Sequence, residues 1–242
     1  MTAREARAPV LCLEHVCRSF PQGDVVVRAL NDVSLTLELG EFVAVAGPSG
    51  SGKTTLLNVA GGLDRPDSGR VLVGGQDVGA LSAAALARMR LEHIGFIFQA
   101  FNLVPVLSAE ENAEFILLLR GVPRAERRAR VRALLEQVGL GGMERRRPAE
   151  LSGGQQQRVA VVRAIAAEPM LVLADEPTAN LDTTTASALL DVMQTLHRQH
   201  HTTFLFSTHD PRVMERARRL IHLRDGRVER DEPLRPPDAE LP

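Results

Sequence analysis

The chain has 242 residues, of which 44% are hydrophobic and 24% charged, and its formal net charge is −1 at pH 7. This length accommodates a large α/β domain with a buried core. The near-neutral charge gives no electrostatic reason to expect nucleic acid or anionic lipid as the main partner. No apolar run approaches the roughly 18 residues that a membrane span needs, and the N-terminus lacks a hydrophobic signal core. We therefore expect a cytoplasmic protein whose membrane role, if any, comes through a partner.

The first hundred residues predict an antiparallel β-layer followed by the first unit of an α/β core. Residues 1–8 are expected to fray. Short apolar or alternating stretches between turn residues predict strands at 10–13, 25–27, 33–39, 41–46, 71–73 and 94–98, with a turn at 21–24 and a helix at 82–90. Cys12 and Cys17 lie beside His15 and could form a metal pair or a disulfide, but we expect small buried thiols.

Residues from about 105 to 150 read as helices that carry most of the arginine crowding. Apolar side chains repeat at helical spacing in one stretch, with arginines on its other sides: Val131, Leu134, Leu135 and Val138 against Arg127, Arg128, Arg130 and Arg132. A nucleic-acid patch is one interpretation of these arginines, and a solvated helix face is the one that we favour. We expect residues 99–157 to form a helical subdomain inserted into an α/β core made of 10–98 and 158–230.

After residue 158 the pattern of alternating strands and helices returns. It predicts helices at 159–167, 186–199 and 212–217, strands at 171–174 and 203–207, and a hairpin around 224–227. The acidic, proline-rich stretch 231–242 is expected to be disordered. His197, His200 and His201 resemble a metal-binding cluster, but we expect a solvated helix end there.

The sharpest local pattern is a phosphate-binding loop of the form G-x-x-x-x-G-K-[ST], between an apolar strand and a helix. Backbone N–H groups and the helix dipole would converge there on an anion, and glycines would let the backbone approach it closely. Lys53 is the only lysine among the 29 Lys and Arg residues, which indicates that a compact ammonium is required. The predicted nucleotide-binding residues are Gly47, Pro48, Ser49, Gly50, Ser51, Gly52, Lys53, Thr54 and the following Thr55, with the Thr54 hydroxyl as a ligand for Mg²⁺.

A second constellation lies at the end of the apolar run 171–174, which delivers Asp175 and Glu176. In α/β sheets ligands bind at the carboxyl ends of strands. Asp175 is placed to hold Mg²⁺, and Glu176 is then free to orient or deprotonate the water that attacks the γ-phosphate. The acidic pair alone would be weak evidence for this chemistry, and the phosphate loop strengthens it.

A third motif, Leu151-Ser152-Gly153-Gly154-Gln155, opens a helix with a serine cap and two glycines. By itself it could be a second phosphate loop or a capped turn. In this context it resembles the signature motif of the ATP-binding cassette (ABC) ATPases, and the resemblance covers about residues 10–230. Four further positions are similar to family motifs: Gln99 to the glutamine loop, Asp182 with 179–181 to the D-loop, His209 to the switch histidine, and Phe20 to the aromatic residue that stacks on adenine.

The resemblance implies a P-loop NTPase core that binds ATP and Mg²⁺ and hydrolyses ATP. It implies that two copies pack head to tail, each ATP lying between Gly47–Thr54 of one copy and Ser152, Gly153, Gly154 and Gln155 of the other, with Asp182 nearby. Glu176, His209 and Gln99 would be catalytic, and Thr54, Gln99 and Asp175 would lie at the metal. Phe20 stands where tyrosine is commoner, and Ala179 where glycine or serine is usual.

Segments 61–69, 101–105 and 174–182 are similar to the branch that contains lipoprotein-releasing, macrolide-export and cell-division ATP-binding subunits. The resemblance implies a peripheral subunit at the inner face of the membrane that powers a separately encoded permease. We expect Phe101, Leu103, Val104 and Pro105 to dock that permease, although they could be core between subdomains. A regulatory ATPase that signals through a membrane partner is the alternative. A DNA-maintenance ATPase would need coiled coils or zinc insertions, and a small-molecule kinase would leave Ser152 and His209 without a role.

Overall fold

The computed structural model describes residues 9–23 and 25–234. The strands are β1 (Leu11–Gln22), β2 (Val25–Leu37), β3 (Phe42–Ala46), β4 (Ser68–Val73), β5 (Gln76–Asp77), β6 (Ile94–Ile97), β7 (Leu171–Ala174), β8 (Thr203–Thr208), β9 (Arg219–Arg224) and β10 (Arg227–Pro233). The α-helices are α1 (Lys53–Ala60), α2 (Ala83–His93), α3 (Ala109–Leu119), α4 (Arg124–Gln137), α5 (Gly153–Ile165), α6 (Thr183–His200) and α7 (Pro211–Met214). Short 3₁₀ turns lie at Val78–Ala80 and Pro148–Glu150. None of the helices in the described ranges is both long and apolar enough to cross a membrane.

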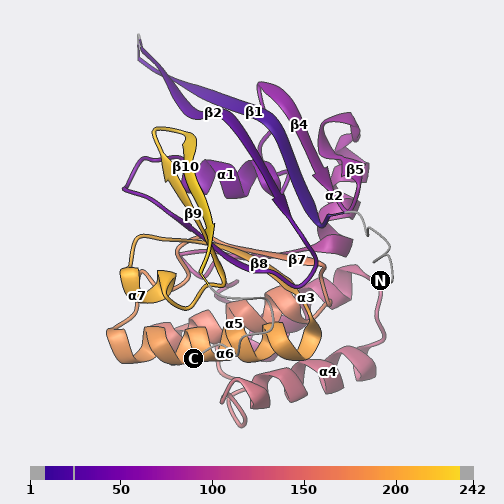
Figure 1. The fold of residues 1–242 in the computed structure, drawn as a ribbon. Helices are drawn as coiled ribbons and strands as arrows, with labels where there is room; N and C mark the ends of the chain where they lie inside the picture. The colour runs from indigo at the N-terminus through magenta and orange to yellow at the C-terminus, as the bar shows by residue number, and fades with distance from the viewer. Residues whose placement is uncertain (1–8, 24, 235–242) are drawn as a thin grey trace, which may run out of the picture.

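Two β-sheets organise these elements. An antiparallel sheet has the order β2-β1-β4-β5, and a larger sheet has the order β10-β9-β3-β8-β7-β6. Neighbouring strands from β9 through β6 in that order run parallel, and only β10 pairs antiparallel. Figure 1 shows α1 between the two sheets, with α3, α4, α5 and α6 below the larger one. The predicted α/β core with an added antiparallel layer is confirmed.

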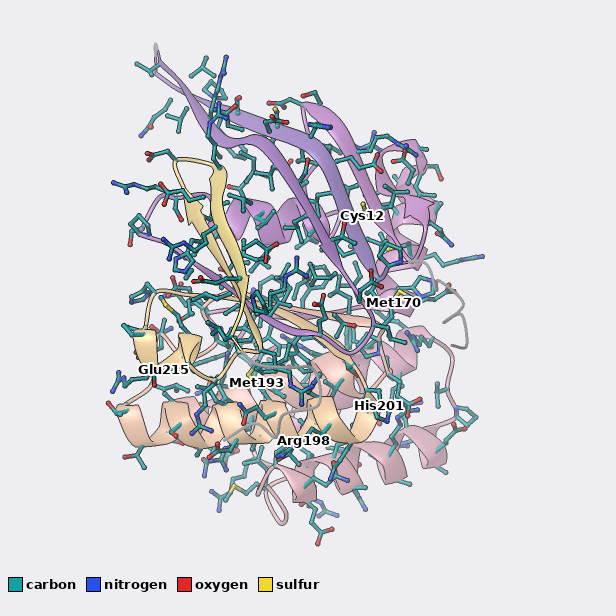
Figure 2. The ribbon with its side chains drawn as sticks, viewed as in Figure 1. Cys12, Met170, Met193, Arg198, His201 and Glu215 are labelled. Carbon is teal, nitrogen blue, oxygen red and sulfur yellow. The ribbon has the colours of Figure 1, made fainter. Side chains whose placement is uncertain are left out.

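Strand β3 shows how the sequence builds a core on both faces of the larger sheet. All five of its residues are buried, as expected for a central parallel strand covered on two sides. Val43 and Val45 join the core around α1, whereas Phe42, Ala44 and Ala46 join the core above α5 and α6. Met193 of α6 is buried in this second core (Figure 2). The alternation along one strand thus fixes the carboxyl end of β3 between two packed layers.

The antiparallel layer is more continuous than the sequence pattern suggests. The predicted strands at 25–27 and 33–39 are one strand, β2, which ends at Leu37, because β1 pairs with it along its whole length through several register shifts. Residues Pro21 and Gln22, expected in the turn, pair with Val26 and Val25. Both cysteines are free and half-buried in β1 rather than buried.

Helix boundaries differ from several of the predicted ranges. Helix α5 begins at Gly153, six residues before the predicted range 159–167 but directly after Ser152, the residue predicted to cap a helix, and α6 begins at Thr183, three residues earlier than expected. Helix α7 is only four residues long. The expectation of disorder from 231 is wrong for residues 231–233, which extend β10 beside β9. The remaining expectations on 1–8 and 235–242 lie outside the described residues.

The helical segment 109–137 has the predicted apolar face, and its arginines have an additional role. Val131, Leu134, Leu135 and Val138 are all buried. The expectation of a solvated face is wrong for Arg127, which is largely buried and donates from Nε to Glu114 Oε2 at 3.0 Å. Arg132 is exposed but makes two hydrogen bonds to the buried Glu110. Since both carboxylates belong to α3, these pairs attach α4 to α3.

His197 also departs from its predicted environment, because it is buried rather than part of a solvated helix end. Its ring centroid lies 5.2 Å from that of Phe42, and its Nδ1 lies 2.8 Å from Thr202 O. Burial is the largest influence on this imidazole and lowers the pKa of His197 below its ordinary value. Among the described residues no cluster of three potential metal ligands exists, here or elsewhere.

The buried ring of His197 predicts a loss of stability in mild acid. As the pH falls through the ordinary histidine pKa of about 6.5, the unfolded state takes up a proton that the folded state resists, so the free energy of unfolding decreases. Urea unfolding of the wild type at pH 7.5 and 5.5 should show this decrease. In His197→Phe the difference in the free energy of unfolding between the two pH values should be smaller by about 1 kcal/mol. His201→Asn, a change at an exposed left-handed position, should leave it unaltered. Equal decreases in the wild type and His197→Phe would contradict the assignment.

Candidate functional site

The predicted site residues follow the carboxyl ends of neighbouring parallel strands. Gly47 follows β3, Asp175 follows β7, and His209 follows β8, while Gln99 lies two residues beyond β6. Because these strands are parallel and adjacent, their carboxyl ends meet at one edge of the sheet. Segments separated by up to 162 positions are therefore brought together, as the motif order implied.

The phosphate-binding loop packs closely against neighbouring backbone at two of its glycines. A Cβ on Gly47 would lie 2.1 Å from Leu223 O, and one on Gly52 would lie 2.2 Å from Ala29 O. Gly52 also has φ +104°, a conformation that L side chains rarely adopt. The turn between β9 and β10 supports the loop from one side, where Gly226 N donates to Ser51 O at 3.0 Å. Only glycine is compatible with these two positions.

Lys53 lies inside the loop, and its side chain is only 6% exposed. Its Nζ donates to Gly47 O at 2.8 Å and to Pro48 O at 3.1 Å. The Ser51 Oγ atom is buried and has no hydrogen-bond partner among the described residues. Pro48, Ser49, Gly50 and Thr54 are exposed on the outer side of the loop, and Thr55 is half-buried behind them. A buried cation, an unpaired hydroxyl and closely packed glycines fit a phosphate group.

Glu176 connects the loop to the histidine. Its Oε1 lies 3.8 Å from Lys53 Nζ, and its Oε2 lies 2.7 Å from His209 Nδ1. Its backbone has φ +44°, which is uncommon outside glycine and frequent at functional sites. The Glu176 N–H donates to Ser207 Oγ at 2.8 Å, which helps to hold this conformation. The carboxylate is thus fixed beside the phosphate-binding loop.

Asp175 is oriented by the same serine. Ser207 Oγ donates to Asp175 Oδ1 at 2.7 Å, and Asp175 N donates to Ile97 O at 2.9 Å. Ser207 thereby positions both acidic residues, a role that the sequence analysis missed. The available signal was a serine that directly follows the apolar run 204–206 in β8.

Gln99 has an exposed side chain, and its backbone is held by residues from two other motifs. Asn180 Nδ2 donates to Gln99 O at 3.0 Å. Gln157 of α5 is fully buried, and its Nε2 donates to Pro177 O at 2.8 Å and, more weakly, to Phe98 O at 3.5 Å. Asn180 belongs to the stretch that resembles the D-loop, but neither its contact nor those of Gln157 could be predicted from the sequence pattern, since they join distant segments.

The start of α5 is an exposed, capped helix end. Ser152 Oγ accepts from Gln155 N at 3.3 Å, and Gln155 Oε1 accepts from Ser152 N at 2.9 Å, a reciprocal capping box. A Cβ on Gly154 would lie 2.2 Å from Thr185 Cγ2. The glycine therefore permits close packing between the ends of α5 and α6, while Ser152 and the half-buried Gly153 remain at the surface.

Asp182 uses its carboxylate to cap α6. Both its oxygens accept hydrogen bonds, from Thr184 N, Thr185 N and Thr185 Oγ1. These hydrogen bonds lower the pKa of Asp182 below its ordinary value. The bond from the Thr185 hydroxyl has the largest effect, and the bonds from backbone N–H groups add to it. Its predicted contribution to nucleotide binding stays a prediction, and its carboxylate is already engaged within its own helix. Phe20 of β1 is 36% exposed and has Arg18 over its ring.

The donors at this edge also suit Mg²⁺, which prefers one or two carboxylates together with substrate phosphates and waters. Asp175, Thr54 and Gln99 supply carboxylate, hydroxyl and amide oxygens, which are hard ligands.

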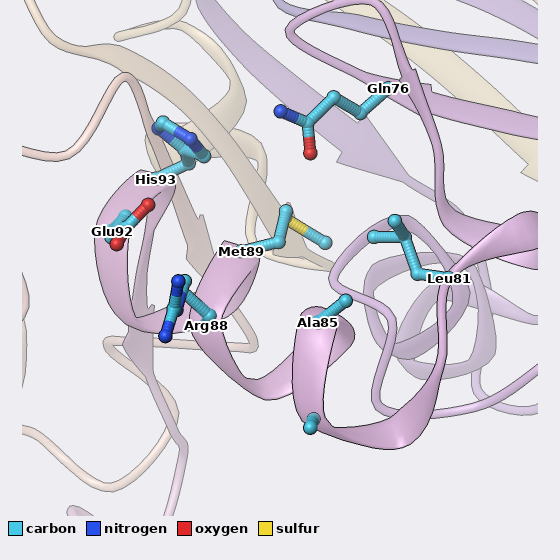
Figure 3. A pocket seen from close by; sticks show the side chains of 8 residues that line it. Gln76, Leu81, Ala85, Arg88, Met89, Glu92 and His93 are labelled. Carbon is cyan, nitrogen blue, oxygen red and sulfur yellow. The ribbon is translucent and has the colours of Figure 1, made fainter.

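A separate hollow of about 350 Å³ lies beside α2 and is lined by Gln76, Leu81, Ala84, Ala85, Arg88, Met89, Glu92 and His93 (Figure 3). No predicted site residue lines that hollow.

The sequence is similar to a known protein family and to several named proteins. The sequence model of the family described as "ABC transporter" matches residues 30–179. "Macrolide export ATP-binding/permease protein MacB" of Sodalis glossinidius is 47% identical over 234 residues, which cover 95% of this chain and 36% of that protein. The protein of the same name from Brucella melitensis is 45% identical over 92% of this chain and 34% of its own. The chain thus spans about a third of the length of these relatives.

Solved structures agree with this. The ATP-binding cassette MJ0796, in a dimeric post-hydrolysis state bound to ADP and Pi, superposes with a TM-score of 0.86 at 40% identity, covering 93% of this chain and 99% of that one. CbiO1 from Clostridium perfringens, part of the ABC transporter complex cbiONQ, superposes with a TM-score of 0.83 at 26% identity, covering 93% and 89%. The phosphate-binding loop, the Asp175–Glu176 pair and these matches together show that the chain belongs to the ABC transporter family, as an ATP-binding cassette with ATPase function.

Proposed function

We propose that this chain is the ATP-hydrolysing subunit of an export-type transporter and works as a head-to-tail homodimer that powers a membrane permease. The observation that carries the proposal is the convergence of Lys53, Glu176 and His209 on one phosphate-binding loop. A cation, a general base and a hydrogen-bond donor are the groups that γ-phosphate transfer to water requires.

The geometry supports a direct hydrolysis mechanism. Glu176 would orient a water molecule and accept its proton as the water oxygen bonds to the γ-phosphorus. The bond from the γ-phosphorus to the β–γ bridging oxygen breaks, and ADP departs with that electron pair. Lys53 would neutralise phosphate charge, and His209 would donate to a γ-phosphate oxygen. Thr54 and Asp175, with Gln99 near them, would hold Mg²⁺, which would supply further neutralisation of phosphate charge.

A second copy would complete the nucleotide site. The His209 side chain is 62% exposed, so the edge that carries the catalytic groups is open to solvent on one side. The signature segment, Ser152 to Gln155, begins α5 at another exposed surface, where helix N–H groups favour an anion. If this segment of one copy faces the loop of the other, the γ-phosphate makes contacts available only in the closed dimer, and binding shifts the equilibrium toward closure. The relative MJ0796 is dimeric in its solved structures.

The helical side of the molecule offers a surface for the permease. Of the four residues predicted to dock it, Phe101 and Leu103 are half-buried, with Leu103 packed on the core, and Val104 and Pro105 are exposed. Val106 is 71% exposed, and Asn112 of α3 holds this loop through hydrogen bonds to both backbone groups of Val104. A separate hollow of about 750 Å³ is lined by residues of α2 and of the carboxyl end of α3: Ala87, Arg88, Leu91, Glu92, Leu119 and Arg120. We place a cytoplasmic helix of the permease against this surface.

The export assignment comes from the relatives. The named MacB proteins carry ATP-binding and permease functions in one chain, of which this chain matches about a third. We propose that here the permease is a separate chain, which would place the ATPase at the cytoplasmic face of the membrane. No nucleic-acid partner is proposed, since arginines of α4 such as Arg127 are paired with carboxylates of α3.

Affinity capture from the native membranes tests this function. Tagged Glu176→Gln protein, incubated with ATP and detergent-solubilised membranes, should retain a stoichiometric multi-span protein with a large extracytoplasmic part. Lys53→Ala protein is the matched control and should retain less of it, because it cannot close around ATP. Mass spectrometry identifies what is retained. Recovery of soluble proteins alone would refute the membrane partnership, and a membrane partner without transport activity would favour the regulatory alternative.

A further inference from the structure

An arginine lies over the aromatic ring that would stack on adenine. Arg18 and Phe20 are two residues apart on β1, which places both side chains on the same face of the strand. The guanidinium carbon of Arg18 is 4.5 Å from the centroid of the Phe20 ring. This distance is typical of a cation–π contact, in which the guanidinium covers one face of the ring. The ring nonetheless stays 36% exposed, so part of it remains available to a ligand.

Two carboxylates fix the position of the guanidinium. Arg18 Nε donates to Asp64 Oδ2 at 3.0 Å, and its Nη2 lies 3.0 Å from Asp64 Oδ1, which makes a bidentate pair. Arg18 Nη1 donates to Asp67 Oδ1 at 2.7 Å. The other oxygen of Asp67 accepts from the backbone N–H of Ser19 at 2.7 Å. Asp67 therefore holds both the guanidinium and the backbone between Arg18 and Phe20.

The charges of this cluster reinforce one another. The hydrogen bond between Arg18 and Asp67 has the largest effect on both groups. It lowers the pKa of Asp67 and raises the pKa of Arg18. Because two carboxylates neutralise the guanidinium, Arg18 is poorly suited to serve as a phosphate ligand of its own. Its effect on a nucleotide would pass through the ring that it covers.

The cluster also ties the ring to the phosphate-binding loop. Asp64 and Asp67 lie in the segment that follows α1, and α1 begins at Lys53 inside that loop. The backbone of this segment is anchored to the helix, since Asp64 N donates to Asn58 O at 3.2 Å. Arg18 thus connects the predicted base-stacking ring on β1 with the carboxyl end of the helix that opens at the phosphates.

We propose that Arg18, fixed by Asp64 and Asp67, is a positioning residue that holds Phe20 for stacking on the base of the nucleotide. The inference rests on the proposed function, in which Phe20 stacks on adenine. Arg18 would then determine affinity for the base while contributing little to the binding of the triphosphate. It acts through Phe20 and does not itself touch the reacting atoms.

Binding of ATP and of inorganic tripolyphosphate, which has no base, separates these contributions. In a Glu176→Gln background that suppresses hydrolysis, isothermal titration should show that Arg18→Met weakens ATP binding about three- to tenfold. Its affinity for tripolyphosphate should change less than about twofold. Arg18→Lys keeps a cation but loses the bidentate pair, and should give an intermediate ATP affinity. In the hydrolysing enzyme Arg18→Met should raise KM for ATP and leave kcat unchanged.

Two controls make the result specific. Arg70→Met removes an arginine that pairs with two carboxylates of the same sheet, Glu14 and Asp77, and should not alter either affinity. In a Phe20→Ala background, Arg18→Met should have no further effect on ATP, because a double-mutant cycle isolates the pair. Equal losses for ATP and tripolyphosphate, or an unchanged ATP affinity, would overturn the role of Arg18. Undiminished ATP binding by Phe20→Ala alone would instead overturn the base-stacking site.

Discussion

Replacement of Glu176 by glutamine is expected to abolish most ATP hydrolysis while ATP still binds. The amide has the shape of the carboxylate but cannot accept the proton of the attacking water, and loss of a general base lowers kcat about 10²- to 10⁴-fold. Hydrolysis no longer removes the γ-phosphate, so the closed dimer should accumulate when ATP is added. Phosphate release measures the rate, and light scattering during gel filtration measures the dimer.

The control for this variant is a carboxylate outside the site. Glu168 is exposed and pairs with Arg130, so Glu168→Gln should hydrolyse ATP at the rate of the wild type. Normal turnover by Glu176→Gln would mean that another group is the base. A monomer in the presence of ATP would contradict the proposed closure and leave the base assignment intact.

Replacement of Lys53 by alanine should remove tight ATP binding. The variant loses a buried cation, and charge-assisted hydrogen bonds contribute about 1.5–3 kcal/mol each, which corresponds to roughly a 10- to 150-fold change in affinity. Titration with a fluorescent ATP analogue would measure this loss. Undiminished affinity would contradict the loop assignment.

Lys53→Arg gives the matched comparison. Lys53 Nζ lies within 3.1 Å of two carbonyl oxygens of its own loop, which leaves little room for a planar guanidinium. Arginine should therefore fail nearly as completely as alanine, although the charge is retained. Full binding by Lys53→Arg would show that charge alone suffices and that the absence of other lysines has no bearing on this site.

The site could be predicted from sequence to the extent that each motif carries its own local structure. An apolar strand, a glycine loop and a helix start define Gly47–Thr54 without help from the rest of the chain, and the structure confirms that context. The same holds for the start of α5, where Ser152 was predicted to cap a helix and does so. That Asp175 and Glu176 lie at the carboxyl end of a strand, where α/β sheets bind ligands, was expected from the apolar run before them, and the resemblance to a family linked this pair to the loop.

Other residues depend on partners far away in the chain, and the sequence pattern could not identify those partners. Arg127 looked like a solvated residue until α3 placed Glu114 beside it, and His197 looked exposed because helix ends usually are. Ser207 was one residue of a predicted strand, and its two hydrogen bonds to the acidic pair require β7 and β8 to be neighbours. Polar residues whose partners lie on another element are therefore the ones for which the sequence pattern is least informative.

The supports of the phosphate-binding loop have a consequence for biosynthesis. Gly47 packs against Leu223 O, and Ser51 O accepts from Gly226 N, yet these partners lie some 175 positions later in the sequence. During synthesis the loop leaves the ribosome early, and the residues of β9 and the following turn that support it leave late. Domains generally fold as units during synthesis. The nascent chain therefore acquires a fully supported nucleotide site only after β9 and the turn at Gly226 have emerged, and a transcript cut short before β9 encodes a loop without these supports.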